Sequence, residues 1–471
     1  MKRKNHELHV IMYFFVAAFL AIIVSISFYL TVNAPKTINS SYNMRQQNLE
    51  KRVIRGTIYS ADGEILAEEA MDHDNVEVRY YPYHELFAHA VGFSTHGKSG
   101  VEYAANIDLL TSNAPVDERL RREMNGERNY GDNIITTYDT EMQKTAFEAL
   151  GIYKGAVIVM EVKTGKILAM VSKPDFDPNT VSENWAEVSA DTGNSPLVNR
   201  ALQGLYPPGS TFKTVTMLEY IRENPDSYGD YSFNCNGKFT YDDTTVNCYH
   251  GSVHGKENLM DSYADSCNSS FANIGTMLDI GDFRSTAEAL LFNKELPFDM
   301  SYSKGSFPLN KTSGSEEIVH SAIGQGNILM TPAHMELITC AIANGGMLMK
   351  PYEIDRQENY RGTVIKQNEP EEFKRLMSED EAAVLKEYME AVVEKGTGRK
   401  FKGLDYKVAG KTGSAEYGNV KGESHSWFTG FSNPDDPDIA VTVIMEGAGS
   451  GSDYAVPVAK RIFDHYYGKA G

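Results

Sequence analysis

Tyr206-Pro207-Pro208-Gly209-Ser210-Thr211-Phe212-Lys213 is the most informative stretch of the sequence, because it sets a serine after a tight turn and a lysine three residues later. A helix that begins at this turn carries Ser210 and Lys213 on one face. A serine hydroxyl becomes nucleophilic when a nearby base takes its proton, and a lysine can be that base when burial or a second cation lowers its pKa. The helix is predicted to be buried, because it continues with the apolar residues Val215, Met217, Leu218 and Ile221.

A second segment, Ser266-Cys267-Asn268, supplies another hydroxyl and an amide. The hydroxyl can relay a proton from the nucleophile to a leaving amine, while the amide can hold the lysine and accept a hydrogen bond from a substrate N–H. These roles require that Ser266 and Asn268 reach the same cleft as Ser210.

A third segment, Lys411-Thr412-Gly413-Ser414, is predicted to lie on the edge strand of a sheet. There, Lys411 raises the local positive potential and helps to lower the pKa of Lys213. The two hydroxyls of the segment can bind a terminal carboxylate, and the glycine lets a substrate backbone come close.

Each pattern also occurs elsewhere in the chain, so none is specific alone. Ser301-Tyr302-Ser303-Lys304 repeats the first pattern, and Lys163-Thr164-Gly165 repeats the third within a predicted hairpin turn. Ser41-Tyr42-Asn43 and Ser182-Glu183-Asn184 repeat the second. Of the two Lys-Thr-Gly copies, only the one that begins at residue 411 follows Ser210 and Ser266, and so completes the order Ser-x-x-Lys, Ser-x-Asn, Lys-Thr-Gly.

In this order the three segments resemble the transpeptidase domain of class B penicillin-binding proteins, the monofunctional peptidoglycan D,D-transpeptidases. The likeness covers nearly all of the chain that follows the N-terminal helix, and the short N-terminal module resembles the compact penicillin-binding protein A type of Gram-positive bacteria. Further segments that match the family are Arg55-Gly56-Thr57-Ile58, Asp62-Gly63-Glu64-Ile65-Leu66-Ala67, Gly165-Lys166-Ile167-Leu168-Ala169-Met170, Gly324-Gln325-Gly326, Thr331-Pro332 and Ala343-Asn344-Gly345-Gly346.

The resemblance implies an α/β (α+β) fold of the penicillin-binding and serine β-lactamase type, with an antiparallel sheet and a helical subdomain. It implies that Ser210 forms an acyl-enzyme with release of D-Ala, and that Lys213 is the general base. Ser266 and Asn268 are then expected to relay protons and hold the substrate amide. Lys411 is expected to set the electrostatic field.

The resemblance also assigns substrate contacts. Thr412 and Ser414 are expected to bind the carboxylate of a stem peptide or β-lactam, and Gly413 to give the substrate backbone room. The backbone N–H groups of Ser210 and Ser414 are expected to form the oxyanion hole, in which one donor is often worth about 3 kcal/mol. The family often has threonine where this chain has Ser414, but the hydroxyl is retained and activity is expected.

The N-terminus contains a predicted membrane anchor, because the chain carries no charge from Val10 to Leu30 and a helix of that length spans about 30 Å. Lys2, Arg3 and Lys4 precede it, so the positive-inside rule places the N-terminus in the cytoplasm and the rest outside. We expect a retained anchor rather than a cleaved signal peptide, for which Val32-Asn33-Ala34 would be the cleavage site.

The chain after the anchor is predicted to form two domains. A polar, glycine-containing segment at residues 125–132 is predicted as the linker between them. The full division is a cytoplasmic tail at 1–9, a transmembrane anchor at 10–32, a non-catalytic pedestal or dimerisation-like domain of small size and mixed structure at 33–132, and a transpeptidase domain at 133–471.

The predicted elements place strands from both ends of the second domain in one sheet around a helical middle. In the first domain, Asp62-Gly63 is predicted as a hairpin turn. In the second, the pattern predicts a helix at 140–150, strands at 156–160, 166–171, 426–431 and 439–445, and a closing helix at 456–467.

Composition restricts the ligands and partners. The net charge of −19 argues against nucleic acid or anionic lipid as a bulk partner. Cys235, Cys248, Cys267 and Cys340 are too few and too scattered for a disulfide scaffold or a Cys-x-x-Cys zinc site, so neither a metal nor another cofactor is expected. Cys235 and Cys248 are close enough in sequence to form a bridge outside the cell; the alternative is two free, buried thiols.

The expected partners are peptidoglycan stem peptides, β-lactams, the membrane and a membrane glycosyltransferase or polymerase of the wall-synthesis complex. A D,D-carboxypeptidase that uses water as acceptor is the alternative enzyme. A β-lactamase is disfavoured, because no Glu-x-x-Leu-Asn segment lies between Ser266 and Lys411. A non-catalytic wall-fragment receptor would need a cytoplasmic output domain. Gln325 and Trp427 are interpreted as a packed turn and a core aromatic rather than cleft residues.

Overall fold

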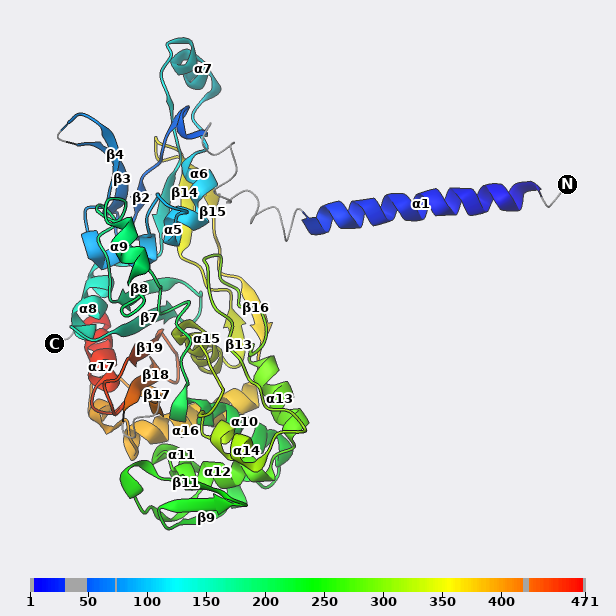
Figure 1. Ribbon diagram of the computed structural model, residues 1–471, viewed down its shortest axis with the longest axis vertical. Coiled ribbons are helices and arrows are strands. Elements are labelled where there is room, and N and C mark those ends of the chain that lie inside the picture. The colour runs from blue at the N-terminus through cyan, green and yellow to red at the C-terminus, as the bar shows by residue number, and fades with distance from the viewer. Residues whose placement is uncertain (1–3, 30–48, 73, 418–422, 469–471) are drawn as a thin grey trace.

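The computed structural model describes residues 4–29, 49–72, 74–417 and 423–468 (Figure 1). Helix α1 (Lys4–Phe28) is long and apolar enough to cross a membrane, and none of its membrane-length window is buried against the rest of the protein. It begins before the anchor predicted at 10–32 and ends at Phe28. Residues 30–32 of that prediction lie outside the described part.

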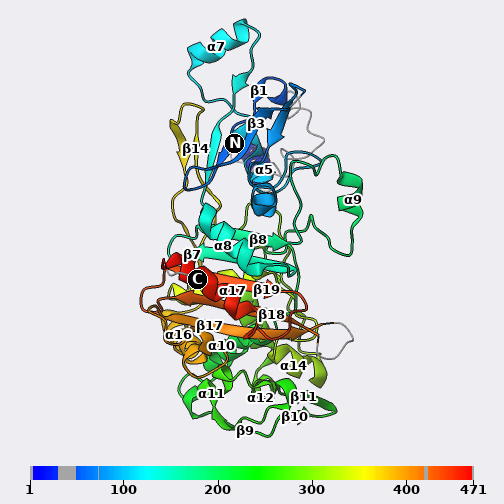
Figure 2. The ribbon, with the colours of Figure 1, turned by 90° about the vertical axis from the view of Figure 1, so that its left-hand side faces the viewer.

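Six strands form a mixed sheet at one end of the molecule, in the order β15-β14-β6-β2-β3-β4 (Figures 1 and 2). The predicted hairpin is confirmed, because β2 and β3 pair antiparallel across the Asp62-Gly63 turn, where Gly63 has a φ of 89°. The strands are β2 (Ile58–Tyr59), β3 (Ile65–Met71), β4 (Glu77–Tyr80), β6 (Asn133–Thr136), β14 (Ile354–Glu358) and β15 (Val364–Gln367).

A buried carboxylate holds the N-terminal part together. Glu102 is fully buried, and it accepts hydrogen bonds from Arg55 at 2.7 Å and Arg79 at 2.6 Å. A buried charge requires such partners. The remaining elements of this part are β1 (Val53–Ile54), η2 (His84–Phe87), α4 (Ala88–Val91), α5 (Gly100–Ala104), α6 (Asn106–Leu109), α7 (Val116–Met124) and β5 (Asn129–Tyr130).

Residues 125–132, predicted as a linker, are instead built into the N-terminal fold. Strand β5 pairs in parallel with β1, and Asp132 is fully buried and accepts a 2.8 Å hydrogen bond from Gln357. Residues 125–127 are exposed, whereas Asn129, Gly131 and Asp132 are buried. Asp132 also accepts hydrogen bonds from Asn113, so the polar composition did not reveal the buried end of the segment. Since Gln357 lies on β14, the sheet crosses the boundary predicted between residues 132 and 133, which stays a prediction.

The two sheets are also connected directly. Tyr352, just before β14, exchanges backbone hydrogen bonds with the hairpin of β7 (Gly155–Glu161) and β8 (Ile167–Lys173). The Ile167 N–H donates to the Tyr352 carbonyl at 3.0 Å, and the Tyr352 N–H donates to the Gly165 carbonyl at 3.0 Å. The Thr137 hydroxyl donates to the carbonyls of both Ile167 and Tyr352. Backbone hydrogen bonds at Tyr352, just before β14, therefore connect the six-stranded sheet to the second sheet.

This second sheet has five antiparallel strands in the order β17-β18-β19-β7-β8, so strands from both ends of the second domain share it, as predicted. Its strands are β7 (Gly155–Glu161), β8 (Ile167–Lys173), β17 (Val408–Glu416), β18 (Ser424–Ser432) and β19 (Ile439–Met445). Strand β17 lies at its edge.

Helices cover both faces of the five-stranded sheet. On one face lie α8 (Thr140–Leu150) and α17 (Ala455–Tyr466), which Figure 2 shows in front of the strands. Both were predicted; α8 begins at the cap Asp139, whose side chain accepts the Met142 N–H at 2.7 Å. The other face packs on α15 (Pro332–Ala343), every residue of which is buried.

The helical middle lies at the end of the molecule opposite the six-stranded sheet (Figure 1). It contains two further hairpin-like pairs, β10 with β11 and β9 with β12. Its elements are α10 (Lys213–Glu223), β9 (Ser232–Cys235), β10 (Lys238–Tyr241), β11 (Thr244–Asn247), β12 (Gly255–Asn258), α11 (Leu259–Ala264), α12 (Asn268–Met277), α13 (Ile280–Ala289), α14 (Ser315–Ala322) and α16 (Glu379–Glu394). The short elements α9 (Trp185–Ala190), β13 (Met347–Met349) and β16 (Glu372–Arg375) lie outside this group.

Candidate active site

Ser210 lies in a 3-10 turn, η3 (Gly209–Phe212), and α10 begins immediately afterwards at Lys213. The sequence predicted a helix start here, and the first turn is tighter than an α-helix. Side chains three residues apart eclipse one another in a 3-10 turn, which places Ser210 and Lys213 on the same side.

Three contacts hold this turn in place. The Gly209 N–H donates to the Gly324 carbonyl at 2.9 Å. Gly209 also lies against Ser414, because a Cβ at Gly209 would be 2.9 Å from the Ser414 carbonyl oxygen, and its φ of 55° favours glycine. Gly324 also needs to be glycine, because its Cβ would lie 2.1 Å from the Gly209 carbonyl oxygen. Trp427 is fully buried and its indole donates to the Pro207 carbonyl at 3.1 Å. The core-aromatic interpretation of Trp427 is therefore confirmed.

The three sequence segments meet at Ser266. The Lys213 ammonium donates to the Ser266 carbonyl at 2.6 Å, the Ser266 hydroxyl at 3.2 Å and the Asn268 amide oxygen at 2.7 Å. Lys411 reaches the same hydroxyl at 3.0 Å and the Thr412 carbonyl at 3.1 Å. Ser266 has a φ of 58°, a strained conformation for a residue with a side chain, which is typical of functional sites.

Both lysines are fully buried, and burial is the main cause of their altered acidity. It lowers the pKa of Lys213 to about 8. Burial and then the charge of Lys213 lower the pKa of Lys411 well below its usual range. The sequence predicted that Lys411 lowers the pKa of Lys213, whereas burial is what lowers it, and the charge effect runs from Lys213 to Lys411. The two amines share the Ser266 hydroxyl, and the positive charge of Lys213 disfavours protonation of Lys411.

The Ser210 hydroxyl is not hydrogen-bonded to its expected base, Lys213. The side chain of Ser210 is half-buried, and in the described part of the chain its hydroxyl makes no hydrogen bond. The Lys213 amine donates its hydrogen bonds to Ser266 and Asn268 instead. Catalytic hydrogen bonds are often long before substrate binds, so the proton transfer from Ser210 to Lys213 stays a prediction.

The Lys-Thr-Gly segment lies on the edge strand β17, as predicted. A Cβ at Gly413 would lie 3.1 Å from Thr211 and 3.2 Å from the Pro208 carbonyl oxygen, so the glycine also lets the strand pack against the nucleophile turn. The Thr412 hydroxyl pairs with Thr397 at 2.6 Å. Sequence reasoning missed Thr397, for which the flanking glycines were the only local signal.

The repeated patterns have ordinary structural roles where the structure describes them. Lys163-Thr164-Gly165 forms the turn between β7 and β8, with a Gly165 φ of 84° and an ion pair from Lys163 to Asp436. Ser301 is exposed, and Lys304 pairs with Glu295. Ser41-Tyr42-Asn43 lies outside the described residues.

The fold brings together four residues with the chemistry of a metal site. Sulfur atoms of Cys235, Cys248 and Cys267 and a ring nitrogen of His254 all lie within 4.8 Å of one another. The expectation of no metal rested on sequence spacing, and that reason is wrong because strand pairing closes the gaps. The cysteines are free thiols in this structure rather than a Cys235–Cys248 bridge.

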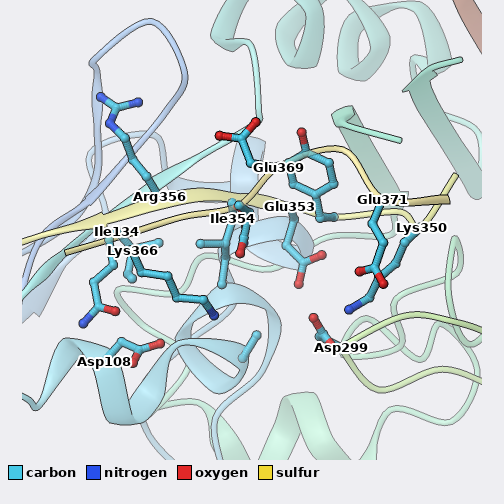
Figure 3. A pocket seen from close by; sticks show the side chains of 14 residues that line it. Asp108, Ile134, Asp299, Lys350, Glu353, Ile354, Arg356, Lys366, Glu369 and Glu371 are labelled. Atoms are coloured by element: carbon cyan, nitrogen blue, oxygen red, sulfur yellow. Dashed lines mark hydrogen bonds between the residues drawn. The ribbon is translucent and has the colours of Figure 1, made fainter. Parts of the chain in front are cut away.

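A cavity of about 310 Å³ lies between the N-terminal part and strands β14 and β15, away from the catalytic segments (Figure 3). Figure 3 shows Glu353 and Asp299 directed toward one another within it. Burial, and secondarily Asp299, raises the pKa of Glu353 to about 8. None of the described residues that line the cavity is a serine, threonine or cysteine, so it offers no nucleophile of the Ser210 kind.

Comparison with known proteins agrees with this geometry. The family model described as penicillin binding protein transpeptidase domain matches residues 155–464, and that of the penicillin binding protein A dimerisation domain matches residues 55–134. A relative named peptidoglycan D,D-transpeptidase PbpA, from Mycolicibacterium smegmatis, is 28% identical over 439 residues, which cover 86% of this chain and 87% of the relative.

Solved structures give the same result. The D,D-transpeptidase domain of a peptidoglycan glycosyltransferase from Eggerthella lenta has a TM-score of 0.77 and 29% identity, covering 88% of this chain and 99% of that one. Penicillin-binding protein A from M. tuberculosis, solved as an imipenem acyl-enzyme complex, has a TM-score of 0.80 and 26% identity, covering 89% of this chain and 99% of that one.

Proposed function

The chain belongs to the penicillin-binding protein transpeptidase family, and on that premise we propose that it is a serine D,D-transpeptidase that cross-links peptidoglycan stem peptides. The observation that carries the proposal is the convergence of Lys213 and Lys411 on Ser266, next to the clamped turn that presents Ser210. This arrangement gives a serine nucleophile, a base of lowered pKa and a second hydroxyl within one buried network.

In the acylation step, the Ser210 oxygen attacks the carbonyl carbon of the penultimate D-Ala and Lys213 takes the hydroxyl proton. The peptide C–N bond then breaks, and the terminal D-Ala leaves as an amine after it receives a proton through Ser266. An ester between Ser210 and the donor peptide remains. Asn268 holds the substrate amide during this step.

In the second step, the amine of another stem peptide attacks the ester carbonyl. The new amide bond forms, the proton of the amine passes to the Lys213–Ser266 pair, and Ser210 is regenerated. A β-lactam acylates Ser210 in the same way, but its amine stays tethered to the acyl group. This is the expected cause of covalent inhibition, consistent with the acyl-enzyme of the M. tuberculosis relative.

The edge strand β17 supplies the substrate contacts in this proposal. Thr412 and Ser414 bind the substrate carboxylate, Lys411 adds positive potential, and Gly413 lets the strand lie against the turn that carries Ser210. The N–H groups of Ser210 and Ser414 stabilise the oxyanion, with about 3 kcal/mol expected from each donor.

The proposed location follows from α1. It anchors the protein in the cell membrane, with the cytoplasmic side marked by Lys2, Arg3 and Lys4, so that the catalytic part lies outside the cell. The proposed division keeps the tail at 1–9, the anchor at 10–32, the non-catalytic domain at 33–132 and the transpeptidase domain at 133–471. Because a transpeptidase joins peptides and not sugars, a membrane glycosyltransferase is the proposed partner.

Labelling with a fluorescent penicillin tests the nucleophile. We expect a covalent band with the wild-type protein that Ser210→Ala abolishes. Ser301→Ala is the matched control, because Ser301 stands in the exposed second Ser-x-x-Lys pattern and its loss should leave the band unchanged. A band that persists in Ser210→Ala contradicts the assignment.

Product analysis separates the two candidate reactions. With a stem-peptide donor and an amine acceptor, a transpeptidase yields the cross-linked product by mass spectrometry. A D,D-carboxypeptidase yields only the donor shortened by D-Ala. Exclusive formation of the shortened peptide under acceptor excess contradicts the transpeptidase proposal.

A further inference from the structure

Three cysteines and a histidine meet beside the Ser-x-Asn segment. Cys235 ends β9, Cys248 follows β11, His254 precedes β12, and Cys267 is the N-cap of α12. The sulfur atoms of Cys235 and Cys248 are 3.6 Å apart, and those of Cys248 and Cys267 are 3.8 Å apart. The Nδ1 atom of His254 lies 3.4 Å from the Cys235 sulfur.

These separations match the edges of a tetrahedron around one zinc ion. Zinc–sulfur bonds of about 2.3 Å and zinc–nitrogen bonds of about 2.0 Å give ligand separations of about 3.8 Å between sulfurs and about 3.5 Å between sulfur and nitrogen. A disulfide needs a separation of about 2.05 Å. The geometry therefore favours a common centre over a bridge between Cys235 and Cys248.

The surroundings are suited to thiolates. All three sulfurs are buried, and each accepts a backbone N–H, an arrangement that stabilises negative sulfur and orients metal ligands. Two of these donors belong to the first turn of α12, whose N-terminus favours negative charge. The three bonds are Gly237 to Cys235 at 3.4 Å, Ser269 to Cys248 at 3.5 Å and Ser270 to Cys267 at 3.4 Å.

From this geometry we propose that Cys235, Cys248, His254 and Cys267 bind one zinc ion. Three thiolates and an imidazole form a soft ligand set that suits zinc and not magnesium or calcium. Four protein ligands complete the tetrahedron and leave no open position for water or substrate. The site is therefore structural rather than catalytic.

The zinc site has a consequence for catalysis that rests on the proposed function. Cys267 lies between Ser266 and Asn268, and the Asn268 side chain donates to the Asn247 carbonyl, next to Cys248, at 3.0 Å. Zinc bound to Cys267 and Cys248 therefore fixes the Ser266–Asn268 segment, which accepts hydrogen bonds from Lys213, and also the neighbouring backbone at residue 247, to which Asn268 donates. It also holds Ser266 in its strained backbone conformation. Its role is positioning.

The metal content of the full-length protein tests the site. Protein purified in detergent and equilibrated with zinc chloride should hold about one zinc per chain by elemental analysis. Cys235→Ser and Cys267→Ser should each lose most of it. Cys340→Ser is the matched control and should keep it, because Cys340 is buried in α15, outside the cluster. A metal-free wild type, or equal loss in Cys340→Ser, overturns the proposal.

A measurement on the wild type covers the case in which the cysteine variants fail to fold. Removal of zinc with a chelator should expose three thiols to alkylation, located by peptide mapping at Cys235, Cys248 and Cys267, and added zinc should protect them again. Alkylation that does not depend on zinc overturns the proposal. So does a Cys235–Cys248 disulfide found in the non-reduced protein.

Penicillin labelling tests the positioning role separately. Zinc-depleted wild type should be labelled at least tenfold more slowly, with recovery when zinc is restored, while Cys340→Ser should be labelled at the wild-type rate. Unchanged labelling after zinc removal overturns the positioning role. Bound zinc without any labelling at Ser210 would count against the proposed transpeptidase and leave the metal site standing, so the two failures are distinguishable.

Discussion

The lowered pKa of Lys213 predicts how the acylation of Ser210 depends on pH. A fall from 10.5 to about 8 corresponds to roughly 3 kcal/mol at about 1.4 kcal/mol per pH unit. At pH 7 about one molecule in ten then carries the free amine, roughly 300-fold more than for an ordinary lysine. Because the free amine is the base, acylation should rise nearly tenfold from pH 6 to pH 7 and level off above about pH 8.

The assay is the second-order rate constant for labelling by a fluorescent penicillin, measured from pH 6 to pH 9.5 at constant ionic strength. Ser210→Ala gives the background. Lys213→Met should be labelled slowly and without the rise between pH 6 and pH 8. A flat wild-type profile, a rise that continues tenfold per pH unit up to pH 9.5, or the same profile in Lys213→Met would refute the assignment of Lys213 as base.

Two further predictions concern the nucleophile turn and the buried acid of the cavity. Gly209→Ala should destabilise the protein by about 1–3 kcal/mol and slow penicillin labelling at least tenfold, because the turn needs a φ of 55° at this residue and has no room for a Cβ. Labelling at the wild-type rate would contradict the conclusion that these contacts hold the Ser210 turn in place. Glu353→Gln should raise the thermal unfolding temperature at pH 9 but not at pH 5, since the raised pKa of Glu353 means that stability is lost as pH rises from about 4.5 through about 8. An equal difference from wild type at both pH values would refute this cause.

Local patterns in the sequence were sufficient to predict much of the second domain. Apolar runs predicted β7, β8, β18 and β19, because these strands are buried and their side chains need no special partners. The ends of α8 were predictable because the N-cap Asp139 and the terminal Gly151 are local signals.

The candidate site was predictable where the chemistry lies in short motifs. The convergence of Lys213 and Lys411 on Ser266 follows the order of the three segments. The supports of the site were not predictable, because Gly324 and Thr397 act through contacts with residues far away in the chain. The burial of Asp132 at the end of the predicted linker was not predictable for the same reason, since its partners Asn113 and Gln357 lie elsewhere in the chain.

The cysteine cluster shows the limit of spacing rules most clearly. Strands β10, β11 and β12 and helix α11 lie between Cys235 and Cys267 in the chain, and no local pattern of the Cys-x-x-Cys kind connects the two cysteines. The pairing of β9 with β12 places Gly255, next to His254, opposite Cys235, while Cys267 reaches the cluster from the start of α12.

The crossing of the six-stranded sheet into the second domain has a mechanical consequence. Strand β14 is covalently continuous with the catalytic half but is hydrogen-bonded to β6, and Tyr352 just before it is bonded to the β7–β8 hairpin. Force applied to the six-stranded sheet is therefore transmitted to the five-stranded sheet through backbone hydrogen bonds. The position of the Ser210 turn relative to the six-stranded sheet is then set by these backbone bonds, so the two sheets should move as one unit.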